Sequence, residues 1–585
     1  MEISKEKIEN LLDKYVTKTF GSDFEFRPQQ KEAIIDISQA FFDGTCNLYL
    51  LDAPTGAGKS IIAMVTAGFL SDFNLNGYIL ASDLALQTQY ENDFKRLNTQ
   101  WGSVKGVDNY NCVVNNEKFS LGECKIKNIS YDKAESTMPC FNDCGYFSNR
   151  KKAIKSPVSL LNYSYWLIQR NYVEPKMKEK GHTIPFPKRD FTFCDEAHKV
   201  SDIVQNHFSP RIDDRSVDKM EKIRMFLQKN RLGAPSVSAL KLRTLVKDMF
   251  KEEDVSKLYN LLKTFELYLI DFIKSSSKVK DVVAERYAKI EVPKEWKFNL
   301  ALLDWLKDMH CKYEDYNHII SQAGLDSLIK NQQGEQIVFN CLDESYMMDR
   351  HFHTQGSFKL LMTATMGDPS VFLKTIGATD ARYFKMDSTF DYEKSPIYFY
   401  PKRKMSMAQK DKTIPWAVKK VDDILSKHKN ERGIIHSGSY EITSRIHAGL
   451  SEENKKRVLI YQGTQEKEKA LERYLYEDNL ILMGPSILEG LDLSADKSRL
   501  QIFLKVPFPS LGDRFVKAKM VNQPDWYDYR TITSILQGIG RSVRKDGDWA
   551  VTYFLDGCLG DLLRRKRSFF PTEMQKRIIV VNEDI

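Results

Sequence analysis

The chain has 585 residues, with 87 lysines and arginines against 79 aspartates and glutamates, a formal net charge of +8. A hydrophobic fraction of 42% and a charged fraction of 28% exclude a disordered chain, a collagen and a small disulfide scaffold. No apolar run reaches the ~20 residues of a membrane helix, and the start, MEISKEKIENLLDKY, lacks the apolar centre of a signal peptide. We therefore expect an intracellular protein with reduced cysteines and no membrane partner, whose basic excess permits nucleic acid as a partner.

Short apolar segments followed by glycine-rich or acidic turns predict an α/β fold. In the first part of the chain the expected strands are 47–51, 77–81, 191–194 and 358–362, and an apolar helix is expected at 61–70. The same rhythm returns after about residue 375, with expected strands at 433–436, 457–461, 479–483, 500–506 and 549–555. The pattern favours two α/β domains.

Two stretches break this rhythm and are expected to be insertions in the first α/β domain. Residues 103–150 are rich in Cys, Asn and Lys and show no clear period. Residues 201–345 are mostly helical in pattern, with apolar side chains at helical spacing that predict packing between helices.

A glycine-rich turn, APTGAGKS, follows the first strand and precedes the first apolar helix. Glycines let the backbone N–H groups of such a turn point at phosphate oxygens, and the helix adds its positive N-terminal end. Lys59 is expected to reach the β- and γ-phosphates and Ser60 to bind Mg²⁺. The other expected nucleotide contacts in this turn are Thr55, Gly56, Ala57 and Gly58. The alternative, a chance glycine-rich turn, fits this strand–turn–helix context poorly.

The acidic box Asp195-Glu-Ala-His198 follows an apolar strand. A carboxylate at the end of a buried parallel strand is well placed to hold Mg²⁺ opposite a P-loop, and we expect Asp195 to do so through water. Glu196 is expected to orient and deprotonate the attacking water. Taken alone these four residues, which have the form of a DEAH box, could equally begin a solvated helix.

Positive charge for the departing γ-phosphate is expected from Arg541 and Arg544, three residues apart on one helical face. Gln537, just ahead of them, and Asp492 are expected to help sense the γ-phosphate. The alternative for both arginines is ordinary surface charge.

Four of the nine cysteines, Cys112, Cys124, Cys140 and Cys144, lie in the first insertion. Reduced thiolates can hold a [4Fe–4S] cluster or a tetrahedral zinc ion, and this spacing does not decide between them. Structural thiols are the third alternative. The other five, Cys46, Cys194, Cys311, Cys341 and Cys558, are expected to be bystanders.

Further motifs stand in a fixed order along the chain. They are Arg27-Pro-Gln-Gln30, the segment 82–89, Asn162-Tyr163, Thr363-Ala-Thr365, the segment 437–440, Glu489-Gly-Leu-Asp492 and Pro507-Phe-Pro509. With the P-loop and the acidic box, they resemble nearly end to end the iron–sulfur superfamily 2 DNA helicases of the XPD/DinG type.

The resemblance implies two RecA-like P-loop domains with an iron–sulfur insert and a helical arch in the first. The expected boundaries are 1–102, 151–200 and 346–374 for motor domain 1, 103–150 for the insert, 201–345 for the arch and 375–585 for motor domain 2. It also implies that Arg27 and Gln30 contact adenine, and it favours a [4Fe–4S] cluster over zinc.

In function, the resemblance implies an ATP-dependent helicase that moves 5′ to 3′ on single-stranded DNA and unwinds duplex DNA. Bases are expected to stack on Tyr146, Phe147 and Tyr163. Phosphates are expected to contact Lys105, Lys125, Lys127, Arg150, Lys151 and Lys152, for which plain solubility is an equal alternative.

Three alternatives stay open: an RNA or RNA–DNA hybrid helicase, a translocase that strips proteins without unwinding, and a non-catalytic scaffold. The intact Lys59, Asp195 and Glu196 argue against the scaffold. We expect a cytoplasmic, nucleoid-associated monomer from a prokaryotic or viral source, with repair or replication proteins as partners; the sequence does not name the pathway.

Overall fold

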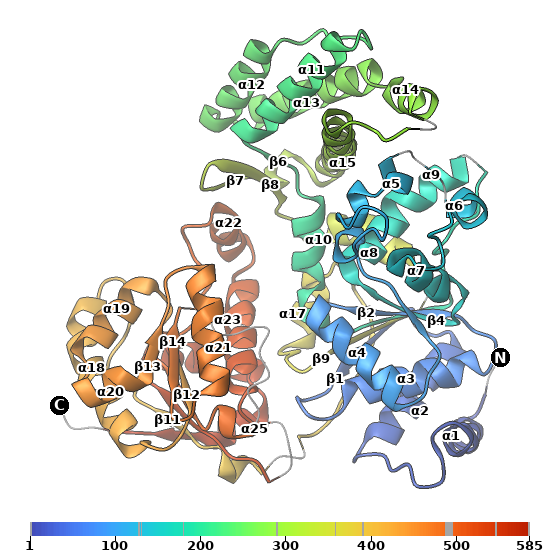
Figure 1. Cartoon of the computed structure of the whole chain (residues 1–585). Helices are drawn as coiled ribbons and strands as arrows, with labels where there is room; N and C mark the ends of the chain where they lie inside the picture. Colours follow the sequence, from blue (N-terminus) through green and yellow to red (C-terminus); the bar gives the residue numbers. More distant parts are fainter. Residues whose placement is uncertain are drawn as a thin grey trace.

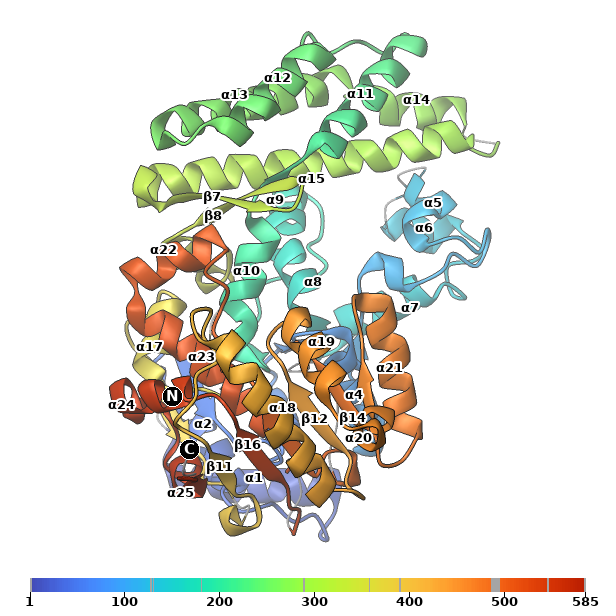
Figure 2. The same ribbon diagram turned by 90° about the vertical axis from the view of Figure 1, so that its left-hand side faces the viewer.

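The computed structural model describes residues 3–126, 129, 131–179, 181–287, 290–356, 358–388, 391–485, 495–543 and 547–582. Two α/β domains lie side by side, and a helical insertion lies above them in both views (Figures 1 and 2). Within the described residues, no helix is both long enough and apolar enough to cross a membrane.

The first domain is built on a parallel seven-stranded sheet. Its strands, in spatial order, are β10 (Arg382–Lys385), β1 (Leu48–Asp52), β9 (Phe358–Thr363), β5 (Phe191–Cys194), β2 (Gly77–Ala81), β4 (Val158–Asn162) and β3 (Gly102–Ser103). The central strands are buried along almost their whole length, as expected when helices cover both faces of a parallel sheet. The four strands predicted here are confirmed, and so is the first apolar helix, α3 (Lys59–Ser71).

The first domain runs further along the chain than the sequence predicted. Strand β10 pairs in parallel with β1, from Tyr49 opposite Arg382 to Asp52 opposite Lys385. The predicted boundary at residue 374 is therefore too early, because the edge strand of the first sheet follows it. A short strand with half of its side chains exposed carries too weak an apolar signal to be assigned to one sheet from sequence alone.

The second domain is built on another parallel seven-stranded sheet. Its strands, in spatial order, are β13 (Val458–Ile460), β14 (Ile481–Gly484), β12 (Gly433–His436), β15 (Leu500–Phe503), β16 (Val551–Phe554), β11 (Ile397–Phe399) and β17 (Ile578–Val580). The five predicted strands are confirmed, whereas the three-residue strands β11 and β17 were missed. Helices α18 (Lys410–Lys427), α19 (Tyr440–Gly449), α21 (Thr464–Tyr476) and α23 (Pro524–Ile539) surround this sheet.

The described residues of the first insertion include the α-helices α5 (Glu123–Ile126), α6 (Tyr131–Thr137) and α7 (Gly145–Lys155), and α7 packs on β3 and β4. The second insertion contains α11 (Asp214–Lys229), α12 (Ala239–Lys251), α13 (Val255–Ser275), α14 (Val279–Arg286) and α15 (Lys294–Ala323). Its predicted apolar stripes are buried between helices, for example at Leu262 and Leu306. The long helix α15 also contacts the first insertion, whose helix α5 lies beneath one of its ends (Figure 2).

A small antiparallel sheet connects the arch to the rest of the molecule. It comprises β6 (Arg211–Ile212), β8 (Gln336–Cys341) and β7 (Leu328–Gln333), with Gly334 at φ 62° in the tight turn between β7 and β8. The second domain reaches this sheet through α22 (Arg514–Asn522), where Asn331 Nδ2 donates to Asp513 Oδ2 at 2.9 Å. The residues 201–345 were predicted to be mostly helical, and the strands of this sheet were not predicted.

Candidate nucleotide-binding and catalytic site

The P-loop lies where β1 ends and α3 begins. Gly56 and Gly58 have φ values of 84° and 79°, which L side chains adopt only with strain. A Cβ on Gly58 would also lie 2.4 Å from Gln30 Nε2, so the turn has no room for a side chain there. Lys59 and Ser60 open the helix, and its N-terminal end and the backbone amides form an anion site.

Arg27 and Gln30 stabilise this loop by hydrogen bonds to its backbone carbonyl oxygens. Gln30 Nε2 donates to the carbonyl oxygen of Ala57 at 2.7 Å, and the Arg27 guanidinium donates to that of Gly56. The Arg27 backbone N–H donates to Gln30 Oε1 at 2.9 Å, which fixes the two residues relative to each other. Both residues therefore support the phosphate loop, and their predicted contact with adenine stays a prediction.

Asp195 and Glu196 follow β5 directly and are among the most constrained residues of the site. Tyr90 donates its hydroxyl to Asp195 Oδ2 at 2.8 Å, and the Glu196 N–H donates to Asp195 Oδ1 at 2.8 Å. Glu196 has φ 51°, a left-handed backbone that is rare outside glycine and typical of functional sites. The box is thus held by its own backbone and by α4 (Leu84–Arg96), which carries Tyr90.

The structure shifts the pKa values of Asp195 and Glu196 in opposite directions. Burial and the neighbouring Glu196 raise the pKa of Asp195 to about 6. Burial alone would raise the pKa of Glu196, but Lys59, His198 and Lys199 lower it below its usual value. The positive charge of Lys59 lowers the pKa of both carboxyls, so the P-loop lysine lies within electrostatic range of the acidic box.

His198 links the acidic box to two other motifs. Its Nδ1 lies 2.9 Å from Thr363 Oγ1 and 3.3 Å from Glu196 Oε2. Its Nε2 lies 2.5 Å from Gln537 Nε2 on helix α23 of the second domain. An Nδ1-protonated ring satisfies both sides, because it donates to Thr363 and accepts from the Gln537 amide. Thr363 in turn accepts the Thr365 N–H at 3.1 Å.

The second domain also approaches the P-loop directly. A Cβ on Gly540, which ends α23, would lie 3.3 Å from Thr55 Oγ1. The half-buried Arg541 follows Gly540, and its positive charge helps to lower the pKa of His436 on β12. Gln537 and Arg541 thus lie at the interface that faces the first domain's loop. Arg544 and Asp492, also predicted for this site, lie outside the described residues.

Sequence reasoning missed a second set of contacts between the domains. Lys519 Nζ of α22 lies 3.1 Å from Glu344 Oε2 of α16 (Glu344–His351), with side chains only 1% and 3% exposed. Nearby, Arg530 of α23 pairs with Asp202 of α10 (Val200–Phe208). No motif spacing marks these residues, because each partner is far away in the chain.

The four cysteines of the first insertion are buried or half-buried free thiols. Cys112, Cys124 and Cys144 are buried, Cys140 is half-buried, and all nine cysteines of the chain are free thiols. Burial raises the pKa of Cys124 to about 12, and Cys144, Cys112 and Cys140 each add to the increase, so all four lie within electrostatic range. Across the described residues, however, no group of three or more His, Cys, Asp or Glu side chains is arranged to hold a metal ion.

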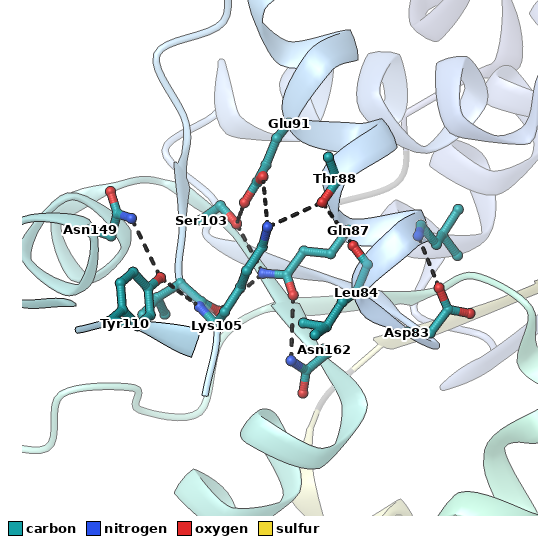
Figure 3. A network of polar contacts seen from close by, with 12 residues as sticks. Asp83, Leu84, Gln87, Thr88, Glu91, Ser103, Lys105, Tyr110, Asn149 and Asn162 are labelled. Atoms are coloured by element: carbon teal, nitrogen blue, oxygen red, sulfur yellow. Dashed lines mark hydrogen bonds and ion pairs between the residues drawn. The ribbon is translucent and has the colours of Figure 1, made fainter. Parts of the chain in front are cut away.

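The motif at 82–89 anchors the first insertion by a polar network (Figure 3). Gln87 Nε2 donates to Ser103 Oγ at 3.0 Å and to the Val104 carbonyl oxygen at 3.1 Å, and its Oε1 lies 3.4 Å from Asn162 Nδ2. Lys105 Nζ donates to Thr88 Oγ1 at 3.1 Å and pairs with Glu91 at 3.2 Å. Lys105, predicted to neutralise phosphates, is therefore paired within the protein.

The prediction that three aromatic side chains stack on bases is wrong for this structure. Tyr146, Phe147 and Tyr163 are only 8%, 7% and 1% exposed. Tyr163 instead donates its hydroxyl to the Asp195 carbonyl oxygen at 3.0 Å, and Tyr146 lies 3.3 Å from Tyr165, hydroxyl to hydroxyl. Aromatic residues in a cysteine-rich insertion serve its small core, which the sequence pattern did not distinguish from a stacking surface.

Comparison with known families gives two matches. Residues 23–232 match the family described as type III restriction enzyme, res subunit, and residues 423–577 match the helicase C-terminal domain. The chain is 21% identical over 462 residues to the ATP-dependent DNA helicase YoaA of Escherichia coli (strain K12), covering 72% of this chain and 68% of that protein.

Two solved structures share the fold over 95% of this chain and 100% of theirs. They are Xpd4 of S. tokodaii, with a TM-score of 0.58 at 13% identity, and an XPD helicase, with 0.59 at 14%. The two parallel sheets, the P-loop and the acidic box define a helicase of two motor domains. These matches are to helicases, and the fold is that of the XPD structures, in agreement with the resemblance seen in the motifs.

Proposed function

We propose that this protein hydrolyses ATP to move 5′ to 3′ along single-stranded DNA and to unwind duplex DNA. The observation that carries the proposal is the contact of His198 with Thr363 on one side and Gln537 on the other. It connects the acidic box of one domain to a helix of the other, so a change at the nucleotide changes the contact between the domains. The similarity to a protein named as an ATP-dependent DNA helicase supports DNA as the substrate.

In this proposal each residue around the P-loop has a separate role in ATP hydrolysis. Lys59 and the loop amides bind the phosphates, and Arg541 and Arg544 stabilise charge on the departing γ-phosphate. Ser60 and Asp195 hold Mg²⁺, which neutralises phosphate charge when it is bound. Glu196, whose pKa is lowered, stays ionised and accepts the proton of the attacking water.

Hydrolysis would be converted into movement through His198. When the γ-phosphate is present, the second domain is held against the P-loop by Gln537 and Arg541. Loss of the phosphate weakens that contact, and the domains separate. Thr363, the last residue of β9, accepts hydrogen bonds from His198 and from the Thr365 N–H, and in this proposal it transmits the change to the first domain's sheet.

The four cysteines of the insertion are proposed to hold a [4Fe–4S] cluster, with zinc as the alternative. The chemistry of the donors supports the proposal, because four free thiols lie within electrostatic range of one another. Two of them, Cys124 and Cys144, belong to the same hydrophobic core as Phe119, Phe141 and Phe147. Four bonds to one group would fix an insertion with few regular elements, which then acts as the wedge between the strands. We further propose a cytoplasmic, nucleoid-associated monomer that works with repair or replication proteins; assignment to the DEAH-box subgroup is part of this proposal.

Comparison of ATP hydrolysis with single-stranded DNA and with RNA of the same sequence tests the substrate. We expect DNA to stimulate turnover at least tenfold more than RNA. Equal stimulation by RNA, or none by DNA, would contradict the proposed function.

A further inference from the structure

Two adjoining cavities lie at the edge of the first sheet opposite the P-loop. One of about 260 Å³ is lined by α7 residues including Ser148, Lys152 and Lys155, and one of about 340 Å³ by Lys155 and the segment 184–190. Asn76 and Asp190, which line the second cavity, immediately precede β2 and β5, so it opens at the amino ends of the parallel strands. The P-loop follows the carboxyl end of β1, so this groove is separate from the nucleotide site.

The groove carries an excess of positive charge. On α7, Lys152 and Lys155 are exposed and one helical turn apart, and the exposed Lys188 lines the second cavity from the segment that precedes β5. Within the described residues no carboxylate pairs with any of these three lysines. Among the described residues that line the groove, Asp190 is the acidic one, and its Oδ2 accepts the Asn76 N–H at 2.8 Å. Nearby, Glu135 pairs with Lys151 at 2.6 Å.

A buried arginine adds charge at the base of the second cavity. Arg189 is 8% exposed and donates to the Gly77 carbonyl oxygen and to Ser159 Oγ, both at 2.8 Å. In the described structure these partners are neutral and no carboxylate forms an ion pair with it. Burial lowers the pKa of Arg189, and the opposing effects of Tyr78 and Asp190 offset only part of that decrease. An anion in the groove would supply that compensation.

The described residues that line the groove present lysines but no exposed aromatic ring. Phe141, which lines the first cavity, is 3% exposed and stacked on Phe147 at 4.9 Å between ring centroids. Sites for single-stranded nucleic acid combine positive charge with exposed rings on which bases stack. A groove with cations and no exposed ring fits a backbone whose bases face inward, as in duplex DNA.

We propose that the groove of Lys152, Lys155, Lys188 and Arg189 binds the phosphodiester backbone of duplex DNA ahead of the point of strand separation. The inference rests on the proposed function, because it places the duplex beside α7, the last helix of the cysteine insertion. It adds a duplex-binding surface on the face away from the nucleotide site, which would hold the substrate while the insertion separates its strands.

The test is binding of a fluorescein-labelled blunt duplex to the full chain by anisotropy at several salt concentrations. The variant Lys152→Ala/Lys155→Ala/Lys188→Ala removes the three exposed cations and leaves Arg189 and the fold in place. Each lost phosphate contact lowers the slope of log K against log salt by about 0.9, so the slope should fall by about 2 to 3. Duplex affinity at 0.1 M salt should fall at least about tenfold.

The matched control is Lys412→Ala/Lys419→Ala/Lys427→Ala, which removes the same charge from the exposed face of α18 in the other domain. It should keep duplex affinity within about twofold. Equal loss in both variants, or unchanged duplex affinity in the first, overturns the groove. ATP hydrolysis stimulated by single-stranded DNA should be unchanged in both variants; its absence in the wild type would contradict the proposed function and not the groove.

Discussion

Gln537 of the second motor domain contacts His198 of the first, with 2.5 Å between their Nε2 atoms. The histidine belongs to the acidic box and the glutamine to a helix that ends against the P-loop. A single imidazole therefore joins the catalytic carboxylates to the domain that must move.

Removal of this contact should slow hydrolysis more than it weakens nucleotide binding. In Gln537→Ala, His198 loses a partner in a buried site at a cost of about 1–3 kcal/mol, which corresponds to roughly a 5- to 150-fold lower kcat for DNA-stimulated hydrolysis. Steady-state kinetics and nucleotide titration separate the two effects. The exposed Gln462→Ala in the same domain is the control; a wild-type kcat in Gln537→Ala would refute the coupling role.

Lys59→Ala and Glu196→Gln should both abolish ATP turnover, for different reasons. The first removes the charge that binds the phosphates, so nucleotide affinity falls as well. The second keeps the shape of the site but removes the base, so a fluorescent nucleotide should still bind. If Glu196→Gln hydrolyses ATP at the wild-type rate, the catalytic base has been assigned to the wrong residue.

Cys140→Ser should lose iron, sulfide and unwinding while it keeps part of the ATP hydrolysis, because the P-loop lies in another part of the domain. Metal and sulfide analysis of anaerobically purified protein measures the first effect, and strand displacement the second. Cys558→Ser, at a cysteine far from the insertion, should behave as wild type. Zinc without iron or sulfide in the wild type would replace the cluster assignment with the zinc alternative.

The buried pair Lys519–Glu344 should be essential to the interface between α22 and the base of the arch. Lys519→Met leaves Glu344 buried without its partner, which costs about 3–5 kcal/mol. The double variant Lys519→Met/Glu344→Gln should regain much of that loss, since no buried charge remains. Lys429→Met, which breaks an exposed pair with Glu453, should cost at most about 1 kcal/mol. Chemical unfolding measures all three, and equal losses for Lys519→Met and Lys429→Met would contradict the buried role.

Stability should fall as the pH falls below about 6.5. Burial lowers the pKa of His351 and of His436 to about 3, so both are neutral in the folded chain and bind protons on unfolding. Between the unfolded and folded values each histidine costs about 1.4 kcal/mol per pH unit. His436 has no hydrogen bond at either nitrogen among the described contacts and stacks on Phe503, so His436→Phe should flatten the dependence. His318→Phe, at an exposed position, should leave it unchanged; a slope unaltered by His436→Phe would argue against this histidine as its source.

The sequence predicted the features that depend on a few consecutive residues. The P-loop and the acidic box each combine a buried strand with the turn that follows it, so their residues could be assigned from a few consecutive positions. The second partners of those residues could not, because Gln30 on the P-loop, Tyr90 on Asp195 and Gln537 on His198 are contacts between separate elements.

The missed strands and the misassigned aromatic residues also depend on contacts between segments that are far apart in the chain. Strands β11 and β17 have three residues each, too few for a period, and β10 joins a sheet that begins with a strand far earlier in the chain. Tyr146 and Phe147 carry the same residue types as a stacking surface, and only packing shows that they form the core of the insertion.

Strand displacement on paired substrates measures whether the protein uses ATP to unwind DNA in the 5′-to-3′ direction. A duplex with a single-stranded 5′ tail and the same duplex with a 3′ tail are incubated with the protein, with and without ATP. The account predicts displacement of the 5′-tailed duplex, only with ATP, and none by Glu196→Gln. ATP turnover without displacement of either substrate, or displacement of the 3′-tailed duplex alone, would contradict it.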